Sequence, residues 1–538
     1  MDKVKSFLHK HAHPSRPPQS NQPPPPPAPS SLTQGFPNDQ DLYRYRKQRG
    51  VNLGLIRSWF VLERWIADGP YCFAAQPGQS DHDVAKGSSA EKVLEHHWDS
   101  WFTEDDWKWI SERGLNTVRI PVGSRFFFYL LAGLPVIGFY HLCGADPSVL
   151  VGTDFAEHYS VFRGAWVRIT NAITTAHRYG IGVLIDLHAA PGKQNADAHS
   201  GTSSSDIAFY TASNMSRTTQ ILLSLLTHLT TFTRTHDPPL PNLVGIELLN
   251  EPNPPGGDHT ALKKWYKMTI AALQTVDPTL PLYIGDSWRT QEYAEFIGSL
   301  EPATPAFLVL DHHLYRCFTQ QDAATPAAQH AQALRSASPF GGAPGTLASA
   351  GGGLVVGEWS GALNPGSLHG VHDEDAEKRA FVDAQMDVFE RECAGWFWWT
   401  FKKQHGGDSG WAMRDAVARG VFPGWVSVKV RAGTNLNDDG GREARRDHAR
   451  DGALGAHSGW WSQYPGHYQH WRFGEGFVRG WDDAYTFFSS TGTATAGGVV
   501  SEIGFKGAWA KRRAAEHVRE RGEGNIWEFE VLTRDYSA

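Results

Sequence analysis

LVGIELLNEP, residues 243–252, has the pattern of a core strand that ends abruptly in polar side chains. Its first part is mostly apolar, which is typical of a strand buried on both faces of a parallel sheet. Glu251 then follows, and Pro252 restricts the backbone after it. LVVGEWSGAL, residues 354–363, has the same form, with Glu358 as its carboxylate. Two core strands that each carry a carboxylate raise the question of whether the two glutamates share one site.

Further segments of the chain repeat this strand pattern. The predicted strands are residues 50–54, 116–122, 181–188, 243–250, 281–286, 306–313, 354–358 and 395–401. Helical patterns separate most of them, at residues 103–114, 166–179, 263–275 and 375–393. Eight strands with helical crossovers predict an α/β fold, a (β/α)8 or TIM barrel. A doubly wound open sheet is the alternative, but no GxGxxG loop follows the first strand.

The two ends of the chain differ from the middle. Residues 1–40 include PSRPPQSNQPPPPPAPSS, which predicts a disordered, Pro-rich tail that could contact an SH3- or WW-type partner. Residues 41–425 are assigned to the barrel. Residues 426–538 are assigned to a helical C-terminal extension packed on it. Its beginning, residues 426–459, is polar and Gly-rich and is predicted to be a long loop, with helices expected at residues 470–488 and 501–521.

Composition argues against several classes of protein. The net charge of -7, without a long basic stripe, argues against a nucleic-acid surface. No apolar run of about 18 residues is present, so no transmembrane segment is expected. The N-terminal stretch does not have the apolar core of a signal peptide, and four scattered cysteines indicate free thiols, so we expect a cytoplasmic protein. The 21 tryptophans favour flat ligands such as sugar rings.

Polar and aromatic residues gather where the predicted strands end. In (β/α)8 barrels, functional groups lie at the carboxyl ends of the strands. Six different strands supply such residues here: Arg119, His188, Asn250, Glu251, His313, Tyr315, Glu358 and Trp399. Packing gives no reason for core strands to end this way, so the residues are predicted to line one site.

Two carboxylates across a pocket are the groups required for glycoside hydrolysis. One must be protonated near neutral pH, and burial together with its partner's charge is expected to raise its pKa. The other must stay ionised, which Arg119 and Tyr315 would favour. Trp399 offers an apolar floor for a sugar ring and Asn250 a hydrogen bond to a hydroxyl. The histidines lack HExxH-type spacing, so neither a metal ion nor a cofactor is expected.

Over residues 50–423 the chain resembles glycoside hydrolase family 5 of clan A, and within it the fungal exo-β-1,3-glucanase-like branch. The motifs that carry the resemblance occur in the order of the family: GVNLGLIRSWFVLERWI, NTVRIPVG, DLHAAPGKQN, GIELLNEP, DHHLYRCF, VVGEWSGAL and GWFWWTFK. The resemblance implies a retaining mechanism with Glu251 as acid/base and Glu358 as nucleophile.

The resemblance also implies the supporting residues. Five of the strand-end residues would surround the two glutamates: Arg119, His188, Asn250, His313 and Tyr315. Glu63 and Trp399 would contact the glucose that is cleaved off, and Phe318 would form one half of an aromatic entrance clamp. The chain departs from the branch at Asp197 and His199, where an aromatic residue and an asparagine are expected.

Three functions remain open from the sequence. The first is a retaining β-glucosidase of the glucan 1,3-β-glucosidase type, acting on a β-glucan or another β-glucoside. The second is an intracellular β-glucosidase that acts on a sterol or sphingolipid glucoside. The third is a catalytically silent protein that binds glucan on an enzyme scaffold.

Overall fold

The computed structural model describes residues 37–53, 80–122, 138–300, 306–403, 406–429, 441–490 and 499–535. The Pro-rich segment and its predicted SH3 or WW contact lie outside these residues, as does Glu63.

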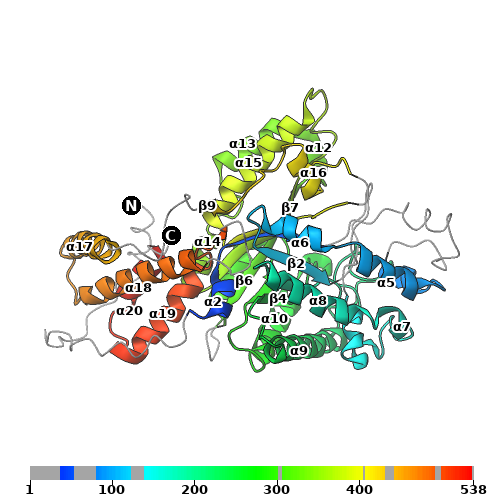
Figure 1. Ribbon diagram of the computed structural model, residues 1–538, viewed down its shortest axis with the longest axis horizontal. Helices are drawn as coiled ribbons and strands as arrows, with labels where there is room; N and C mark the ends of the chain where they lie inside the picture. Colours follow the sequence, from blue (N-terminus) through cyan, green and yellow to red (C-terminus); the bar gives the residue numbers. More distant parts are fainter. Residues whose placement is uncertain are drawn as a thin grey trace.

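Eight parallel strands close into a barrel at the centre of the molecule (Figure 1). They are β1 Gln48–Asn52, β2 Thr117–Val122, β3 Gly182–Leu187, β4 Leu243–Glu247, β5 Leu282–Gly285, β6 Leu308–Arg316, β7 Gly353–Leu363 and β8 Gly395–Trp398. Each strand pairs with the next along the chain, and β1 also pairs with β8. The predicted (β/α)8 barrel is confirmed, and the sheet is closed rather than open.

Helices follow the strands and surround the barrel (Figure 1). Before β4 they are α2 Asp39–Tyr45, α4 Asp81–Ala85, α5 Ala90–Ser100, α6 Glu104–Ser111, α7 Tyr159–Phe162, α8 Ala165–Arg178 and α9 Ala212–Thr235, with 3-10 turns η1 Phe139–Gly144 and η2 Pro147–Leu150. After β4 come η3 Pro255–Gly257, α10 Thr260–Leu273, α11 Thr290–Ser299, α12 Gln320–Ala324, α13 Ala327–Ser336, α14 Ala343–Ala350, α15 Glu374–Glu392 and α16 Met413–Ala418. Among the described residues, no helix combines the length and apolar character needed to cross a membrane.

The four predicted barrel helices correspond to α6, α8, α10 and α15. The Thr103 N-cap forms a capping box with Asp106, which fixes the start of α6. Gly114 and Gly180 follow α6 and α8 with φ of 75° and 70°, in the left-handed region that glycine adopts without a steric cost. Helix α2 was not predicted. It begins at Asp39, inside the range assigned to the tail, because Asn38 and Asp41 form a capping box there.

Closure of the barrel depends on a close approach at Gly50. A Cβ atom at this position would lie 2.3 Å from the ring of Phe397 on the neighbouring β8. Any larger residue would push β1 away from β8, so the absence of a side chain here lets the two strands pair.

The segment after residue 426 covers the amino-terminal end of the barrel. Strand β10 Val499–Val500 pairs with β9 Val428–Lys429, and the backbone N–H of Gly504 donates to the carbonyl of Tyr45 at 2.9 Å. A second hydrophobic cluster joins this segment to side chains at the base of the strands. It includes Tyr45, Phe307, Phe397, Ile503, Phe505 and Trp509. The extension therefore shares a core with the barrel.

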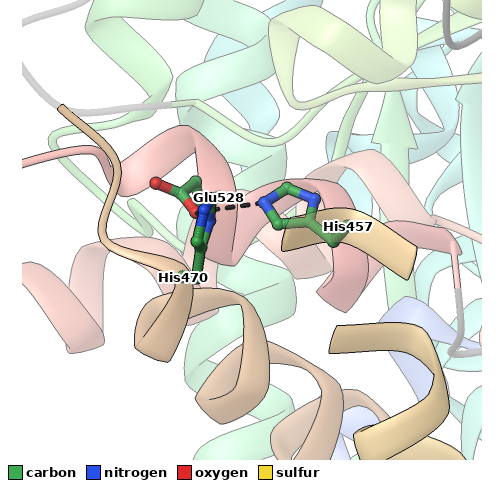
Figure 2. Close-up of side chains that lie close together, drawn as sticks. All are labelled: His457, His470 and Glu528. Carbon is green, nitrogen blue, oxygen red and sulfur yellow. Dashed lines mark hydrogen bonds and ion pairs between the residues drawn. The ribbon is translucent and has the colours of Figure 1, made fainter. Parts of the chain in front are cut away.

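Four helices lie together in this extension (orange to red in Figure 1): α17 Arg442–Trp461, α18 His470–Ser489, α19 Lys506–Arg521 and α20 Ile526–Asp535. The helices expected at 470–488 and 501–521 are confirmed as α18 and α19. The long loop expected over 426–459 is wrong, because α17 occupies much of it. No residue of α17 is fully buried, so the segment has no apolar stripe to mark it as a helix. Figure 2 shows where α17, α18 and α20 meet, at His457, His470 and Glu528.

Candidate active site

Glu251 stands just beyond β4 in a strained backbone conformation. Its φ is 42°, which residues other than glycine rarely adopt and which costs of order 1 kcal/mol or more. Two hydrogen bonds hold the turn: Asn195 Nδ2 donates to the Glu251 carbonyl at 3.0 Å, and Ser287 Oγ donates to the Pro252 carbonyl at 2.6 Å. These contacts with neighbouring loops hold Glu251 in the strained conformation, so that its carboxylate points into the mouth of the barrel.

Glu358 lies within β7, and the residue before it is fixed from two sides. The N–H of Gly357 donates to Asp311 Oδ1 at 2.6 Å, and its carbonyl accepts Asn52 Nδ2 at 2.8 Å. A Cβ atom on Gly357 would lie 2.1 Å from the Asp311 carboxylate, so only glycine fits. These contacts fix the register of β7 at the point where Glu358 enters the site.

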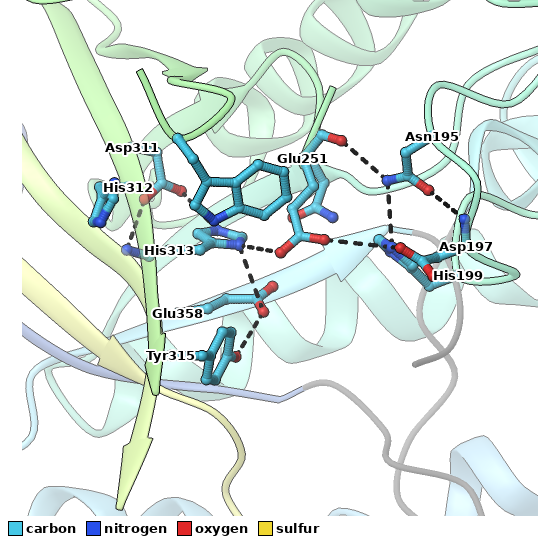
Figure 3. Close-up of polar contacts among 12 residues, drawn as sticks. Asn195, Asp197, His199, Glu251, Asp311, His312, His313, Tyr315 and Glu358 are labelled. Atoms are coloured by element: carbon cyan, nitrogen blue, oxygen red, sulfur yellow. Dashed lines mark hydrogen bonds and ion pairs between the residues drawn. The ribbon is translucent and has the colours of Figure 1, made fainter. Parts of the chain in front are cut away.

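The structure brings the two glutamates together around His313 (Figure 3). His313 Nδ1 is 2.7 Å from Glu251 Oε1 and 3.6 Å from Glu358 Oε2. One carboxylate oxygen of each glutamate and His313 Nδ1 all lie within 4.8 Å of one another. Tyr315 donates its hydroxyl to Glu358 Oε2 at 2.9 Å. The two carboxyl groups are therefore as close as retaining glycosidases require, and too close for the wider inverting arrangement.

Arg119 lies beneath Glu358 and is fully buried. Nη1 donates to Glu358 Oε1 at 3.0 Å, and Nη2 donates to Asn250 Oδ1 at 2.8 Å. The guanidinium also forms ion pairs with Asp186 at 2.9 Å and Glu247 at 2.8 Å. One cation thus neutralises several buried carboxylates, so Arg119 supports the fold of the site as well as the charge of Glu358.

The charges around Glu251 favour its ionised form. Although burial disfavours the charge, the hydrogen bond from His313 and the positive charges of His313 and His199 lower the pKa of Glu251 to about 2. The expectation that the acid's pKa is raised is therefore wrong for Glu251 in this substrate-free site. Burial instead raises the pKa of Glu358, although His313, Arg119 and Tyr315 act in the opposite direction.

Both imidazoles beside Glu251 are held in their charged form. Burial lowers the pKa of His313, but the charge of Glu358 and hydrogen bonds to carboxylates outweigh it, so the pKa is raised. For His199, burial is outweighed by the contact with Asp197 and the charge of Glu251, and its pKa is raised too. The sequence predicted that one glutamate is protonated near neutral pH. In the structure, His313 and His199 hold the proton instead.

Asp197 and His199, the two departures from the family pattern, form a charge chain behind Glu251 (Figure 3). His199 Nε2 is 3.4 Å from Glu251 Oε2 and 3.6 Å from Asp197 Oδ2. His199 is buried, whereas the Asp197 side chain is 45% exposed. Asparagine in place of His199 could not carry the charge, so His199 contributes to the lowered pKa of Glu251.

His188, Asn250 and Trp399 complete the inner wall. His188 Nδ1 pairs with Asp186 Oδ2 at 2.8 Å, and His188 Nε2 lies 3.3 Å from Asn250 Nδ2. The His188 ring stacks on Trp399 with 5.9 Å between centroids and 17° between planes. This stacking fixes the Trp399 indole just after β8, where it can form an apolar floor for a sugar ring.

Phe318, expected as one half of an aromatic entrance clamp, lies at the surface beside two other aromatic residues. Phe318 is 46% exposed and contacts Tyr315 and Trp411, with centroids 5.4 Å and 5.9 Å away. Phe209 and Tyr210 are the aromatic residues that could take the place of the missing ring; Phe209 is fully buried, and the half-buried Tyr210 donates its hydroxyl to the Gln194 carbonyl at 2.9 Å. Trp411 was not predicted, because it follows β8 in a stretch without strand periodicity.

Trp288 was also missed. It is 50% exposed, has a φ of 57°, and lines a small hollow with Glu251 and His313. An exposed tryptophan in a strained turn beside the carboxylate is a ready stacking surface for a sugar ring beyond Glu251.

The buried carboxylates around Arg119 were missed as well. Asp186, Glu247 and Asp311 lie inside strands or at strand ends, and all are buried. Burial raises the pKa of Asp186 to about 7 and raises that of Glu247 strongly, with Arg119 opposing both shifts. The signal was present in the sequence, because a glutamate inside an otherwise apolar core strand, as in LVGIELLN, needs a buried partner.

Two sets of side chains in this site are each close enough together to ligate a metal ion. The first set is Glu251, His313 and Glu358, and the second is Glu247, Asp311 and His313. Arg119 forms ion pairs with members of both sets. A divalent cation would be placed beside the guanidinium charge, so these carboxylates are better suited to pairing with Arg119 than to holding a metal.

Comparison with known families covers both parts of the chain. Residues 83–405 match the family model "Cellulase (glycosyl hydrolase family 5)". Residues 442–535 match a second model, "Glucan 1,3-beta-glucosidase 3 C-terminal domain", which spans α17 to α20.

Similar proteins are found among curated and solved chains. The chain is 29% identical to the glucan 1,3-beta-glucosidase 3 of Schizosaccharomyces pombe over 91% of this chain and 94% of that protein. It is 28% identical to an uncharacterized glycosyl hydrolase of Saccharomyces cerevisiae over 91% and 90% of the two chains. The crystal structure of rutinosidase from Aspergillus niger aligns with a TM-score of 0.51 and 17% identity over 70% of this chain and 98% of that one, which shows a shared fold.

Proposed function

Since the chain belongs to glycosyl hydrolase family 5, we propose that it hydrolyses β-glucosidic bonds with retention of configuration, with Glu358 as nucleophile and Glu251 as acid/base. The observation that carries this proposal is the proximity of the two carboxylates, whose oxygens lie within 4.8 Å. At that separation one carboxylate can attack the anomeric carbon directly, and no room is left between them for a nucleophilic water.

The surroundings of Glu358 support its role as nucleophile. Arg119 and Tyr315 each donate a hydrogen bond to a different carboxylate oxygen. The group is held in one orientation, and its negative charge is stabilised against burial. Attack on the sugar would form a covalent glycosyl-enzyme ester that water later hydrolyses.

The acid role of Glu251 needs a proton that the free carboxylate does not hold. His313 Nδ1 donates to Glu251 Oε1 at 2.7 Å, so a proton can pass along this hydrogen bond. The proton then moves from Glu251 to the leaving oxygen as the glycosidic bond breaks. In the second step Glu251 takes a proton from the attacking water and passes it back to His313 along the same hydrogen bond, which returns the site to its starting state.

For the substrate we propose a terminal β-1,3-linked glucose or a small β-glucoside. Support comes from the names of the relatives and from the aromatic surfaces of Trp288, Phe318 and Trp399 around the carboxylates. The carboxylate of Asp197, in place of an aromatic ring, weakens the grip on a second glucose. We therefore expect long β-1,3-glucan to be a poorer substrate than a short glucoside.

The test compares Glu358→Ala and Glu251→Ala on aryl β-glucosides with good and poor leaving groups. Glu358→Ala should lose nearly all turnover and recover part of it with azide, giving the inverted glycosyl azide. Glu251→Ala should keep the first step only for good leaving groups, because these need little protonation. Equal losses on both kinds of substrate would contradict the acid role. Absence of any turnover by the wild type would favour a silent glucan-binding protein.

Product analysis separates the two enzymatic possibilities. Release of glucose from laminarin-type oligomers supports the glucan assignment. Activity confined to glucosyl sterols or glucosyl sphingolipids would instead support the lipid glucosidase.

A further inference from the structure

Two imidazoles and a carboxylate converge in the C-terminal extension, outside the barrel. His457 lies on α17, His470 is the first residue of α18, and Glu528 lies on α20 (Figure 2). Glu528 Oε2 is 3.0 Å from His457 Nε2 and 2.9 Å from His470 Nδ1. The three atoms lie within 4.8 Å of one another. Donors from three separate helices thus meet at one point.

The carboxylate of this cluster is fully buried, with 0% of the Glu528 side chain exposed. Its Oε1 accepts the backbone N–H of Gln469 at 2.6 Å, so Oε2 is the oxygen turned toward both imidazoles. A buried carboxylate is costly without positive charge nearby, and the Arg472 guanidinium supplies such charge from a neighbouring position. The imidazole nitrogens that face Oε2 can each offer a lone pair to a metal ion.

Aromatic neighbours hold both imidazole rings in place. His457 stacks on Phe473 with 3.9 Å between centroids and 24° between planes. Tyr468 lies nearly parallel to His470, at 5.4 Å and 8°. Ring orientations that are fixed before a ligand arrives lower the cost of binding it. The His470 side chain is 29% exposed, so the cluster opens to solvent on that side.

We propose that His457, His470 and Glu528 bind a divalent transition metal ion, with Zn²⁺ as the best fit. Two histidines and a glutamate are an established zinc ligand set, and solvent would take the fourth position. Tetrahedral bonds of 2.0–2.1 Å place neighbouring ligand atoms about 3.3 to 3.4 Å apart. The two nitrogen–oxygen distances therefore widen by only about 0.4 Å. Each imidazole places its hydrogen on the nitrogen that does not bind the metal.

The packing of α17 indicates what a metal ion would contribute to the fold. No side chain of α17 is fully buried, and it contacts α18 through a small cluster around Phe473 and Phe477 and through ion pairs of Arg442 and Arg446 with Asp482. A metal bound to His457 would tie α17 to α18 and α20. Because the unfolded chain cannot assemble the three ligands, the free energy of metal binding would stabilise this part of the fold.

The experiment uses the full chain, stripped with a chelator and dialysed. Metal analysis after incubation with ZnCl₂ should give about one zinc per chain, and calorimetry should show a single matching site. CoCl₂ should give the intense visible absorption of a tetrahedral Co²⁺ site, which a hydrogen-bonded cluster does not produce. Zn²⁺ should also raise the melting temperature above that of the stripped protein.

Variants decide whether this cluster is the site. His470→Gln and Glu528→Gln should each weaken Zn²⁺ binding by at least about 100-fold, since each removes a ligand. His467→Gln, a nearby histidine on the surface, is the matched control and should bind as the wild type does. His470 is partly exposed, so His470→Gln should keep its circular dichroism spectrum. Absence of stoichiometric zinc in the wild type, or equal affinity in His470→Gln and His467→Gln, would overturn the proposal.

Discussion

Replacing Tyr315 by phenylalanine tests how the charge of Glu358 is maintained. The hydroxyl donates to Glu358 Oε2 at 2.9 Å inside a buried site and is one of the groups that lower the carboxyl pKa. A hydrogen bond to a charged group contributes about 1.5 to 3 kcal/mol. Its loss should therefore raise the pKa of Glu358 further.

The assay is the pH dependence of kcat/KM on an aryl β-glucoside with a good leaving group. Such a substrate needs little protonation, so the acidic limb reports the ionisation of the nucleophile. Because the variant's carboxylate is protonated at higher pH, the acidic limb should move to higher pH. Activity on the plateau should fall by about 10- to 150-fold if the same bond also orients the nucleophile.

A surface tyrosine provides the matched control. Tyr179 also donates its hydroxyl to a carboxylate, Glu104 Oε1, at 2.6 Å, but in an exposed position. Tyr179→Phe should leave the pH profile unchanged. If Tyr315→Phe lowers activity equally at every pH and the acidic limb stays at its wild-type position, the reasoning about Glu358 is refuted.

Two further outcomes follow from contacts elsewhere in the fold. Hydrogen bonds and charge from Arg49 hold the pKa of Glu390 at about 2 despite burial, so Glu390→Gln should cost about 3 kcal/mol in denaturant unfolding at neutral pH. Since the folded-state pKa is depressed, this difference should shrink as pH falls from about 4.5 toward about 2, and a constant difference would contradict it. Asp197→Phe should restore a stacking surface and raise kcat/KM for laminarin-type oligomers about fivefold relative to an aryl glucoside, at about 1 kcal/mol per stack. No gain would show that Asp197 does not limit the second glucose site.

The barrel was predictable because its strands are buried on both faces. Runs such as LVGIELLN are apolar enough to recognise, and their polar ends pointed to Glu251, Glu358 and the residues near them. The direction of the Glu251 pKa shift was not predictable, because it depends on His199 and His313 arriving from two other loops and strands. Helix α17 was not predicted. None of its residues is fully buried, so its sequence has no apolar periodicity that would indicate a helix.

The hydrophobic cluster at the base of the barrel has a consequence for synthesis. Ile503, Phe505 and Trp509 cover apolar side chains that include Tyr45 and Phe307, yet they follow the end of β8 by roughly a hundred residues. At about 5 to 20 residues per second, the ribosome needs about 5 to 20 s to supply them. During that interval all eight strands exist with an uncovered apolar base. We therefore expect truncation before residue 503 to yield aggregates rather than a smaller enzyme, which expression and solubility of the truncated chain would check.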